Sequence, residues 1–154
     1  EIVDGIRQKQ SEFQIEIIEV KIDSADNITK AFDKLKKQVD AIYMVADPVI
    51  YTKDATLTLI NECKNAKLPF IAYSDAFVKA GALMSVSPSY STIGSQAASI
   101  AEKILIDKVT PQSVGVEAPI GTFFVINAIT SNEIGITTNE DVLNFADKVY
   151  RAGE

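Results

Sequence analysis

The feature that most constrains the fold is a continuous apolar run at residues 41–46, AIYMVA. Asp40 precedes this run, and Asp47 and Pro48 follow it. A short apolar run without alternation is typical of a strand that is buried on both faces of a parallel sheet. Parallel neighbours need long crossover connections, which are usually helices. The run therefore favours an α/β fold in which strands and helices alternate.

The remaining sequence supports this alternation. Apolar residues at helical spacing predict helices at residues 1–10, 26–38, 54–67, 75–80, 89–107 and 138–150, with a short helix after Asn127. Apolar or alternating runs predict strands at 13–20, 41–46, 70–73, 82–86 and 122–126, and Pro and Gly punctuate an extended connection at 108–121. We expect one α/β domain over residues 1–150, built on a doubly wound parallel sheet.

The start of the chain raises a question about the sheet. In a doubly wound sheet of order 2-1-3-4-5, strand 1 lies at the centre, and residues 1–10 match the helix that would follow it. Without strand 1, two sheet edges would be left unpaired. We therefore expect a fragment of a longer protein, or a gap filled by another molecule, for example in a strand-exchanged homodimer. The alternative is that the strands are assigned wrongly.

The composition excludes several classes of function. The net charge of −6 and the isoelectric point near 4.7 leave no basic stripe for nucleic acid phosphates. The chain has no histidine, the commonest general base and metal ligand, and its single cysteine, Cys63, cannot form an internal disulfide or a thiolate cluster. We expect Cys63 to be a buried helix residue, and we expect no metal or cofactor. No apolar run is long enough to span a bilayer.

Polar side chains follow two of the predicted strands. Asp47 comes directly after strand 41–46, and Ser74 and Asp75 come after strand 70–73. If these strands are parallel neighbours, the three residues lie at the carboxyl edge of the sheet, where α/β folds bind small ligands. The carboxylates suit the ammonium of a free amino acid, and Ser74 with nearby backbone N–H groups suits its carboxylate.

Aromatic side chains near this edge could form a wall for an apolar ligand, and we name Tyr73 and Tyr51. Each candidate also has a purely structural interpretation. Asp47 and Asp75 could be helix caps, Ser74 could satisfy the local backbone, and Tyr43 in the middle of strand 41–46 is expected to belong to the core.

Three sequence blocks carry a resemblance to a known family. They are VDAIYMVADPVI at 39–50, LPFIAYSDAFVKAGALMSVSPSYSTIGSQAASIAEKIL at 68–105 and FVINAITSNEIGI at 124–136. In order and spacing they resemble the substrate-binding proteins of ABC transporters, in the TrpX-like branch associated with tryptophan and tyrosine. The resemblance covers most of residues 1–150 and corresponds only to the C-terminal lobe of such a protein.

The resemblance implies a type I periplasmic-binding fold, in which two lobes close on a ligand that a membrane permease then accepts. It implies an extracytoplasmic location, an absent upstream lobe and a crossover near the hinge within residues 109–136. Asp47 is followed by Pro48 where the family commonly has a polar residue, and Ser87–Tyr90 replaces a Gly-Asp-Tyr-Tyr type sequence. These departures bear on the identity of the ligand more than on the fold.

The leading hypothesis is therefore a solute-binding component of an ABC importer, specific for an amino acid that could be aromatic. A ligand-sensing domain of a signalling or regulatory protein is the alternative, because the same fold serves both uses. An enzyme with Asp47 and Asp75 as an acid–base pair is disfavoured, since the chain has no histidine, nucleophile elbow or phosphate loop.

Overall fold

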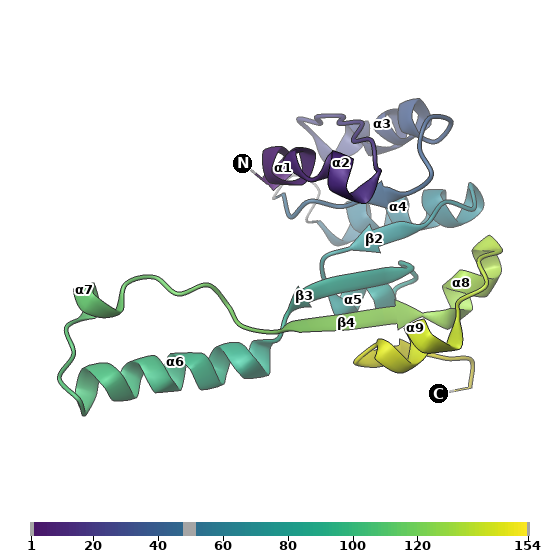
Figure 1. The fold of residues 1–154 in the computed structure, drawn as a ribbon. Coiled ribbons are helices and arrows are strands. Elements are labelled where there is room, and N and C mark those ends of the chain that lie inside the picture. The colour runs from purple at the N-terminus through teal and green to yellow at the C-terminus, as the bar shows by residue number, and fades with distance from the viewer. Residues whose placement is uncertain (1, 48–51, 154) are drawn as a thin grey trace.

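The computed structural model describes residues 2–47 and 52–153 (Figure 1). Its helices are α1 (Ile2–Gln8), α2 (Gln10–Phe13), the 3₁₀ turn η1 (Ala25–Asn27), α3 (Ile28–Leu35), α4 (Lys53–Asn65), α5 (Asp75–Lys79), α6 (Tyr90–Leu105), α7 (Pro111–Val114), α8 (Ala128–Ile134) and α9 (Glu140–Phe145). Its strands are β1 (Ile42–Tyr43), β2 (Phe70–Ala72), β3 (Met84–Pro88), β4 (Thr122–Asn127) and β5 (Lys148–Tyr150).

The strands form one sheet in the order β1-β2-β3-β4-β5. The pairs β1–β2, β2–β3 and β4–β5 are parallel, as predicted for a doubly wound fold, whereas β3 and β4 are antiparallel. The prediction of an entirely parallel sheet is therefore wrong at β4. Residues 89–121 leave and return at the same end of β3, because Pro88 pairs with Thr122, so β4 has to run in the opposite direction.

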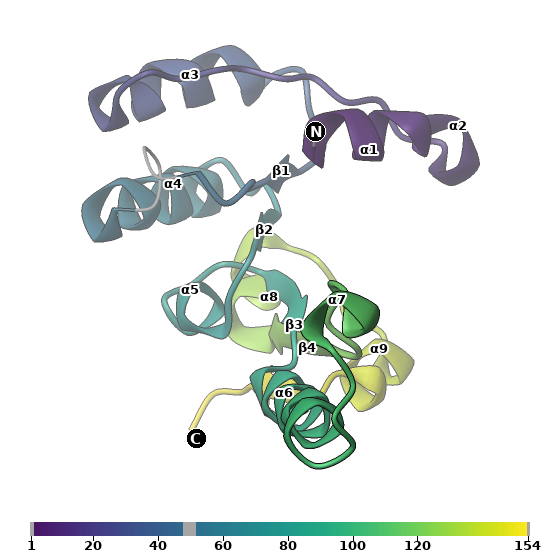
Figure 2. The same cartoon turned by 90° about the vertical axis from the view of Figure 1, so that its left-hand side faces the viewer.

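Helices lie on both sides of this sheet. Figure 2 shows α3, α4 and α5 on one side of the strands, with α1, α2 and α9 on the other. The main core lies between the sheet and the first group, where α3 and α4 bury apolar side chains against β1 and β2. The cluster comprises Phe32, Ile42, Met44, Ile60, Cys63, Phe70, Ala72 and Ala82. The prediction that Cys63 is a buried helix residue is confirmed.

The apolar run at residues 41–46 is buried on one face only. Ile42 and Met44 are buried, but Tyr43 between them is 56% exposed, so its predicted place in the core is wrong. Successive side chains of a strand point to opposite faces, and only the face toward the α3–α4 core is closed here.

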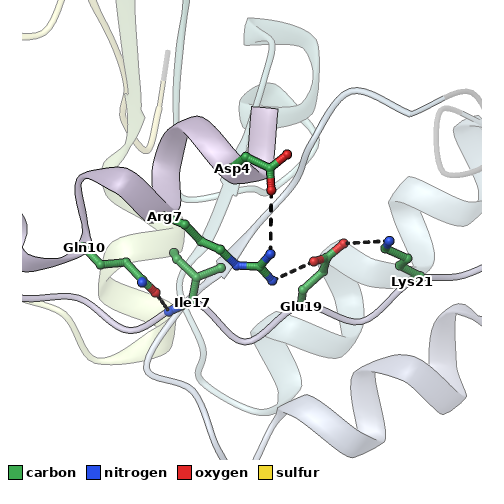
Figure 3. A network of polar contacts seen from close by, with 6 residues as sticks. All are labelled: Asp4, Arg7, Gln10, Ile17, Glu19 and Lys21. Carbon is green, nitrogen blue, oxygen red and sulfur yellow. Dashed lines mark hydrogen bonds and ion pairs between the residues drawn. The ribbon is translucent and has the colours of Figure 1, made fainter. Parts of the chain in front are cut away.

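Residues 13–20 do not form the predicted strand. Gln10–Phe13 is the short helix α2, and residues 15–22 have no regular secondary structure and no ladder partner among the described residues. Side chains hold this segment to α1 instead (Figure 3): Gln10 accepts the Ile17 amide at 2.8 Å, and Arg7 pairs with Glu19 at 2.8 Å. Asp4 and Lys21 extend the same network, at 3.8 Å from Arg7 and Glu19 respectively. The missing first strand stays a prediction.

Residues 89–121 form an arm that projects from the sheet and contains α6 and α7 (Figure 1). Ser89 caps α6 by accepting the Thr92 amide, and the returning chain is tied to α6 through Gln96, which donates to the Ala118 carbonyl at 3.0 Å. The helix is where the sequence predicts it, but none of its residues is buried. Leu105 at the end of α6 is 67% exposed and Ile106 after it is 69% exposed, so these apolar side chains lie in solvent in this structure.

The last predicted helix, at residues 138–150, is a short helix followed by a strand. Asn139 caps α9, and Ala146 then adopts an extended conformation (φ −70°, ψ 135°), which ends the helix. Residues 148–150 pair with β4 as the edge strand β5, and Asp147 accepts the Phe124 amide at 2.7 Å. The apolar residues that continue the helical pattern, Val149 and Tyr150, therefore belong to a strand.

Candidate functional site

The two strands that precede the candidate residues are parallel neighbours, as predicted. Ile42 pairs with Phe70 and Tyr43 with Ile71, and the Met44 amide donates to the Ile71 carbonyl at 3.0 Å. The chain therefore leaves β1 toward Asp47 and leaves β2 toward Ser74 at the same edge of the sheet. The topology brings both loops to the carboxyl edge.

Asp47 does not cap the helix that follows it. Thr52 has this role, because its hydroxyl accepts the Ala55 amide at 3.3 Å at the start of α4. The carboxylate of Asp47 is exposed. The helix-cap interpretation of Asp47 is wrong, and Tyr51, the other candidate in this loop, lies outside the described residues.

Ser74 occupies the N-cap position of α5 with extended backbone angles (φ −149°, ψ 153°). Its hydroxyl makes no cap hydrogen bond, although its carbonyl accepts the amides of Phe77 at 3.2 Å and Val78 at 3.4 Å. The side chain of an N-cap serine usually accepts a backbone amide of the first helical turn. The Ser74 hydroxyl does not have this common structural role.

Asp75, the first residue of α5, binds two side chains of β5. One carboxylate oxygen accepts the Tyr150 hydroxyl at 2.7 Å, and the other accepts the Lys148 ammonium at 2.9 Å. The ammonium also lies 4.6 Å from the centre of the Tyr150 ring. Lys148 and Tyr150 reach the same carboxylate because alternate residues of a strand share one face.

Sequence reasoning missed Lys148 and Tyr150 because it placed them on a helix, where residues two apart do not face each other. The signal for a strand was the alternation of Lys148, Val149 and Tyr150 after Asp147, but three residues are too few to outweigh the helical pattern before them.

The cluster shifts the pKa of each of its members. Partial burial acts to raise the pKa of Asp75, but the hydrogen bonds from Tyr150 and Lys148 and the positive charges nearby outweigh it, so the pKa is lowered. The pKa of Lys148 is raised by the phenol oxygen of Tyr150 and by Asp75. Burial and the Asp75 carboxylate raise the pKa of Tyr150. At neutral pH, Asp75 and Lys148 are therefore both charged.

The other end of α5 is held by buried amide and hydroxyl groups. The Asn127 amide donates to the Val78 carbonyl at 2.8 Å, and the Thr130 hydroxyl donates to the Gly81 carbonyl at 3.1 Å. Asn127 and Thr130 are both buried. The carboxyl end of α5 is thus fixed from β4 and α8, and its amino end is fixed from β5.

Tyr73 lies beside Ser74 at the end of β2. It is half-buried, and its ring meets that of Phe77 edge to face, with 5.2 Å between the ring centres. Both rings pack against the main core. A rigid aromatic pair therefore stands next to the polar residues of this edge.

Within residues 2–47 and 52–153, no group of three or more His, Cys, Asp or Glu side chains has a geometry that could hold a metal ion. No helix in the same part of the chain is both long and apolar enough to cross a membrane.

The comparison with known families decides what this lobe belongs to. The family of ABC transporter substrate-binding proteins matches residues 2–150. The chain belongs to this family. Its members are binding proteins and not enzymes, which agrees with the absence of a predicted catalytic group. One curated relative is a tyrosine-binding protein of Clostridioides difficile (strain R20291), 26% identical over 146 residues; the match covers 94% of this chain and 38% of the relative.

Solved structures share the fold of this substrate-binding lobe. A conserved domain protein from Vibrio cholerae is 25% identical with a TM-score of 0.77, and 96% of this chain matches 49% of that one. An ABC domain from Streptococcus pneumoniae in complex with L-Trp is 23% identical, also with a TM-score of 0.77, 96% coverage of this chain and 49% of that one. The ligand-free, open form of a Clostridium difficile substrate-binding protein with adhesive properties is 19% identical, with a TM-score of 0.76, 96% coverage of this chain and 48% of that one. The chain spans about half the length of these structures and 38% of the curated relative.

Proposed function

We propose that this lobe forms one wall of an amino acid site in an ABC importer, with an aromatic amino acid as the ligand. The observation that supports this most directly is the delivery of Asp47 and Ser74 to one sheet edge by parallel neighbouring strands. Thr52 is the N-cap of α4, and the Ser74 hydroxyl makes no cap hydrogen bond with α5. The relatives named for tyrosine and solved with L-Trp favour an aromatic ligand.

The geometry suggests which residues bind the ammonium and the carboxylate of the ligand. Asp47 is an exposed carboxylate just after β1 and suits the ligand ammonium, whereas the charge of Asp75 is balanced by Lys148. The hydroxyl of Ser74 suits the ligand carboxylate. Asp75 contributes through its position beside Ser74, and its oxygens keep lone pairs for a further hydrogen bond.

The aromatic end of the ligand would contact Tyr73, whose ring is fixed by Phe77. A ring held by a second ring loses little freedom when a ligand packs on it. Edge-to-face and offset contacts of this type contribute about 0.5–1.5 kcal/mol beyond the area that they bury.

The opposite wall of the site would come from a second lobe of the same protein. Relatives about twice as long as this chain support a second lobe. We place the crossover between lobes in the arm at residues 89–121 and the segment that follows it, which includes the predicted range 109–136. The arm leaves the sheet at the end of β3 and returns to it at the start of β4, and its apolar side chains Leu105, Ile106 and Val116 are exposed.

Ligand binding from both sides would favour a closed form of the two lobes, which a membrane permease then recognises. This role places the protein outside the cytoplasm, in the periplasm or on a lipid anchor. The family match supports import over a signalling role.

Isothermal titration calorimetry of the full-length protein with L-tyrosine and L-tryptophan tests the proposal. We expect Asp47→Ala to weaken the binding roughly 10- to 100-fold in Kd, because it removes a charge-assisted hydrogen bond. Asp40→Ala is the matched control, because Asp40 is an exposed aspartate at the opposite end of the same strand. The proposal fails if no aromatic amino acid binds, or if the two variants lose the same affinity.

A further inference from the structure

The charged contact between α5 and β5 lies at the border of the proposed ligand site and includes Asp75. Asp75 comes directly after Ser74 in the chain, whereas Lys148 and Tyr150 are 73 and 75 residues away. The contact therefore ties the last strand of the chain to the loop that we propose to meet the ligand.

The two ends of α5 are held in different ways. At the carboxyl end, the hydrogen bonds from Asn127 and Thr130 are buried, so that end is fixed independently of the solvent. At the amino end, the side chains of Asp75 and Lys148 are 37% and 42% exposed, and Ser74 adds no cap bond. The amino end of α5 is thus held by a half-exposed ionic contact and by the two amides that donate to the Ser74 carbonyl.

We propose that Lys148 and Tyr150 are positioning residues for the ligand site: by holding Asp75, they fix where the Ser74 hydroxyl lies at the sheet edge. This inference rests on the proposed function. Two donors from one strand hold the two oxygens of one carboxylate, which fixes its direction as well as its distance. The contact of Lys148 with the Tyr150 ring keeps the two donors together.

The matched control is another ion pair of the same lobe. Lys64 of α4 and Glu133 of α8 are 2.6 Å apart, with side chains 34% and 47% exposed. The pair resembles Lys148–Asp75 in type and exposure but joins two helices away from the Ser74 loop. Lys64→Met therefore removes an equivalent ion pair without touching that loop.

The experiment compares Tyr150→Phe, Lys148→Met and Lys64→Met in the full-length protein, with L-tyrosine and L-tryptophan as probes in calorimetry. We expect about fivefold or greater loss of affinity for the first two variants and wild-type affinity for Lys64→Met. Lys148→Arg keeps a donor of the same charge, so this variant should bind the amino acid probes more tightly than Lys148→Met does.

Hydrogen exchange separates positioning from a general loss of stability. The amides of Phe77 and Val78, which donate to the Ser74 carbonyl, should exchange faster in Tyr150→Phe, while the Gly81 amide, which donates to the Val78 carbonyl, should not change. If the wild type binds, two results would overturn the positioning role alone. One is exchange that becomes faster uniformly along α5 in Tyr150→Phe, and the other is wild-type affinity in Tyr150→Phe and Lys148→Met. Absence of binding by the wild type would remove the proposed function and this inference with it.

Discussion

Among single residues, Asp75 has the clearest consequence for stability. Its carboxylate accepts hydrogen bonds from Tyr150 and Lys148, and its pKa in the folded chain is lowered. A group of this kind stabilises the fold at pH values above its unfolded pKa of about 3.9. The contribution is lost as the pH falls through the lowered pKa of the folded state.

This sign leads to a prediction for Asp75→Asn. The variant should be less stable than the wild type at pH 7, and the difference in free energy of unfolding should shrink as the pH falls below about 4. Urea unfolding followed by circular dichroism across pH 3–7 measures it, with Asp40→Asn as an exposed control. A difference that stays constant over this range would contradict the assigned charge contact.

Cys63 gives a second prediction at the residue scale. Its side chain is 1% exposed, and burial, with a smaller effect of Glu62, raises the pKa of the thiol to about 12. The folded chain should therefore react with a thiol reagent such as DTNB at pH 8 only as fast as it unfolds, whereas the chain in urea should react at once. Equal rates in both conditions would show that Cys63 is accessible.

At the scale of elements, the contact of β4 with α5 depends on Asn127. Its side chain donates to the Val78 carbonyl and accepts the Thr130 amide, so it joins three elements from a buried position. Asn127→Ala leaves both partners unsatisfied, and we expect a loss of about 2–3 kcal/mol in the free energy of unfolding. Asn144→Ala, at an exposed position in α9, should change it little in the same urea titration. Equal effects of the two substitutions would contradict the proposed contact.

Elements with a strong local signal could be predicted from the sequence. The helices α4 and α6 begin and end within two residues of the predicted ranges 54–67 and 89–107, and α8 follows Asn127 as predicted. The segment at residues 13–20 and β5 were assigned wrongly, because a strand is stabilised by a partner that is distant in the sequence. The candidate edge could be predicted from the order of the strands. The contact of Asp75 with Lys148 could not, because it depends on β5, and local periodicity did not reveal that strand.

At the scale of the whole molecule, we propose that the arm links the described lobe to a second one. Leu105 is 67% exposed in this structure, so replacing it would be nearly neutral if the arm stayed in solvent. If the second lobe covers the arm, Leu105→Lys in the full-length protein should cost about 2 kcal/mol or more, because the change places a charge in an apolar interface. Glu102→Lys on the same helix is the control in denaturant unfolding. Equal, small effects of the two variants would argue that the arm is not an interface between lobes.

We propose that the sheet edge with Asp47 and Ser74 holds the polar end of an aromatic amino acid. The most direct measurement is a crystal structure of the full-length protein with L-tyrosine or L-tryptophan bound. We expect the ligand ammonium about 3 Å from the Asp47 carboxylate, the ligand carboxylate beside the Ser74 hydroxyl, and Asp75 still bound to Lys148 and Tyr150. A ligand bound elsewhere, with neither Asp47 nor Ser74 in contact, would contradict it.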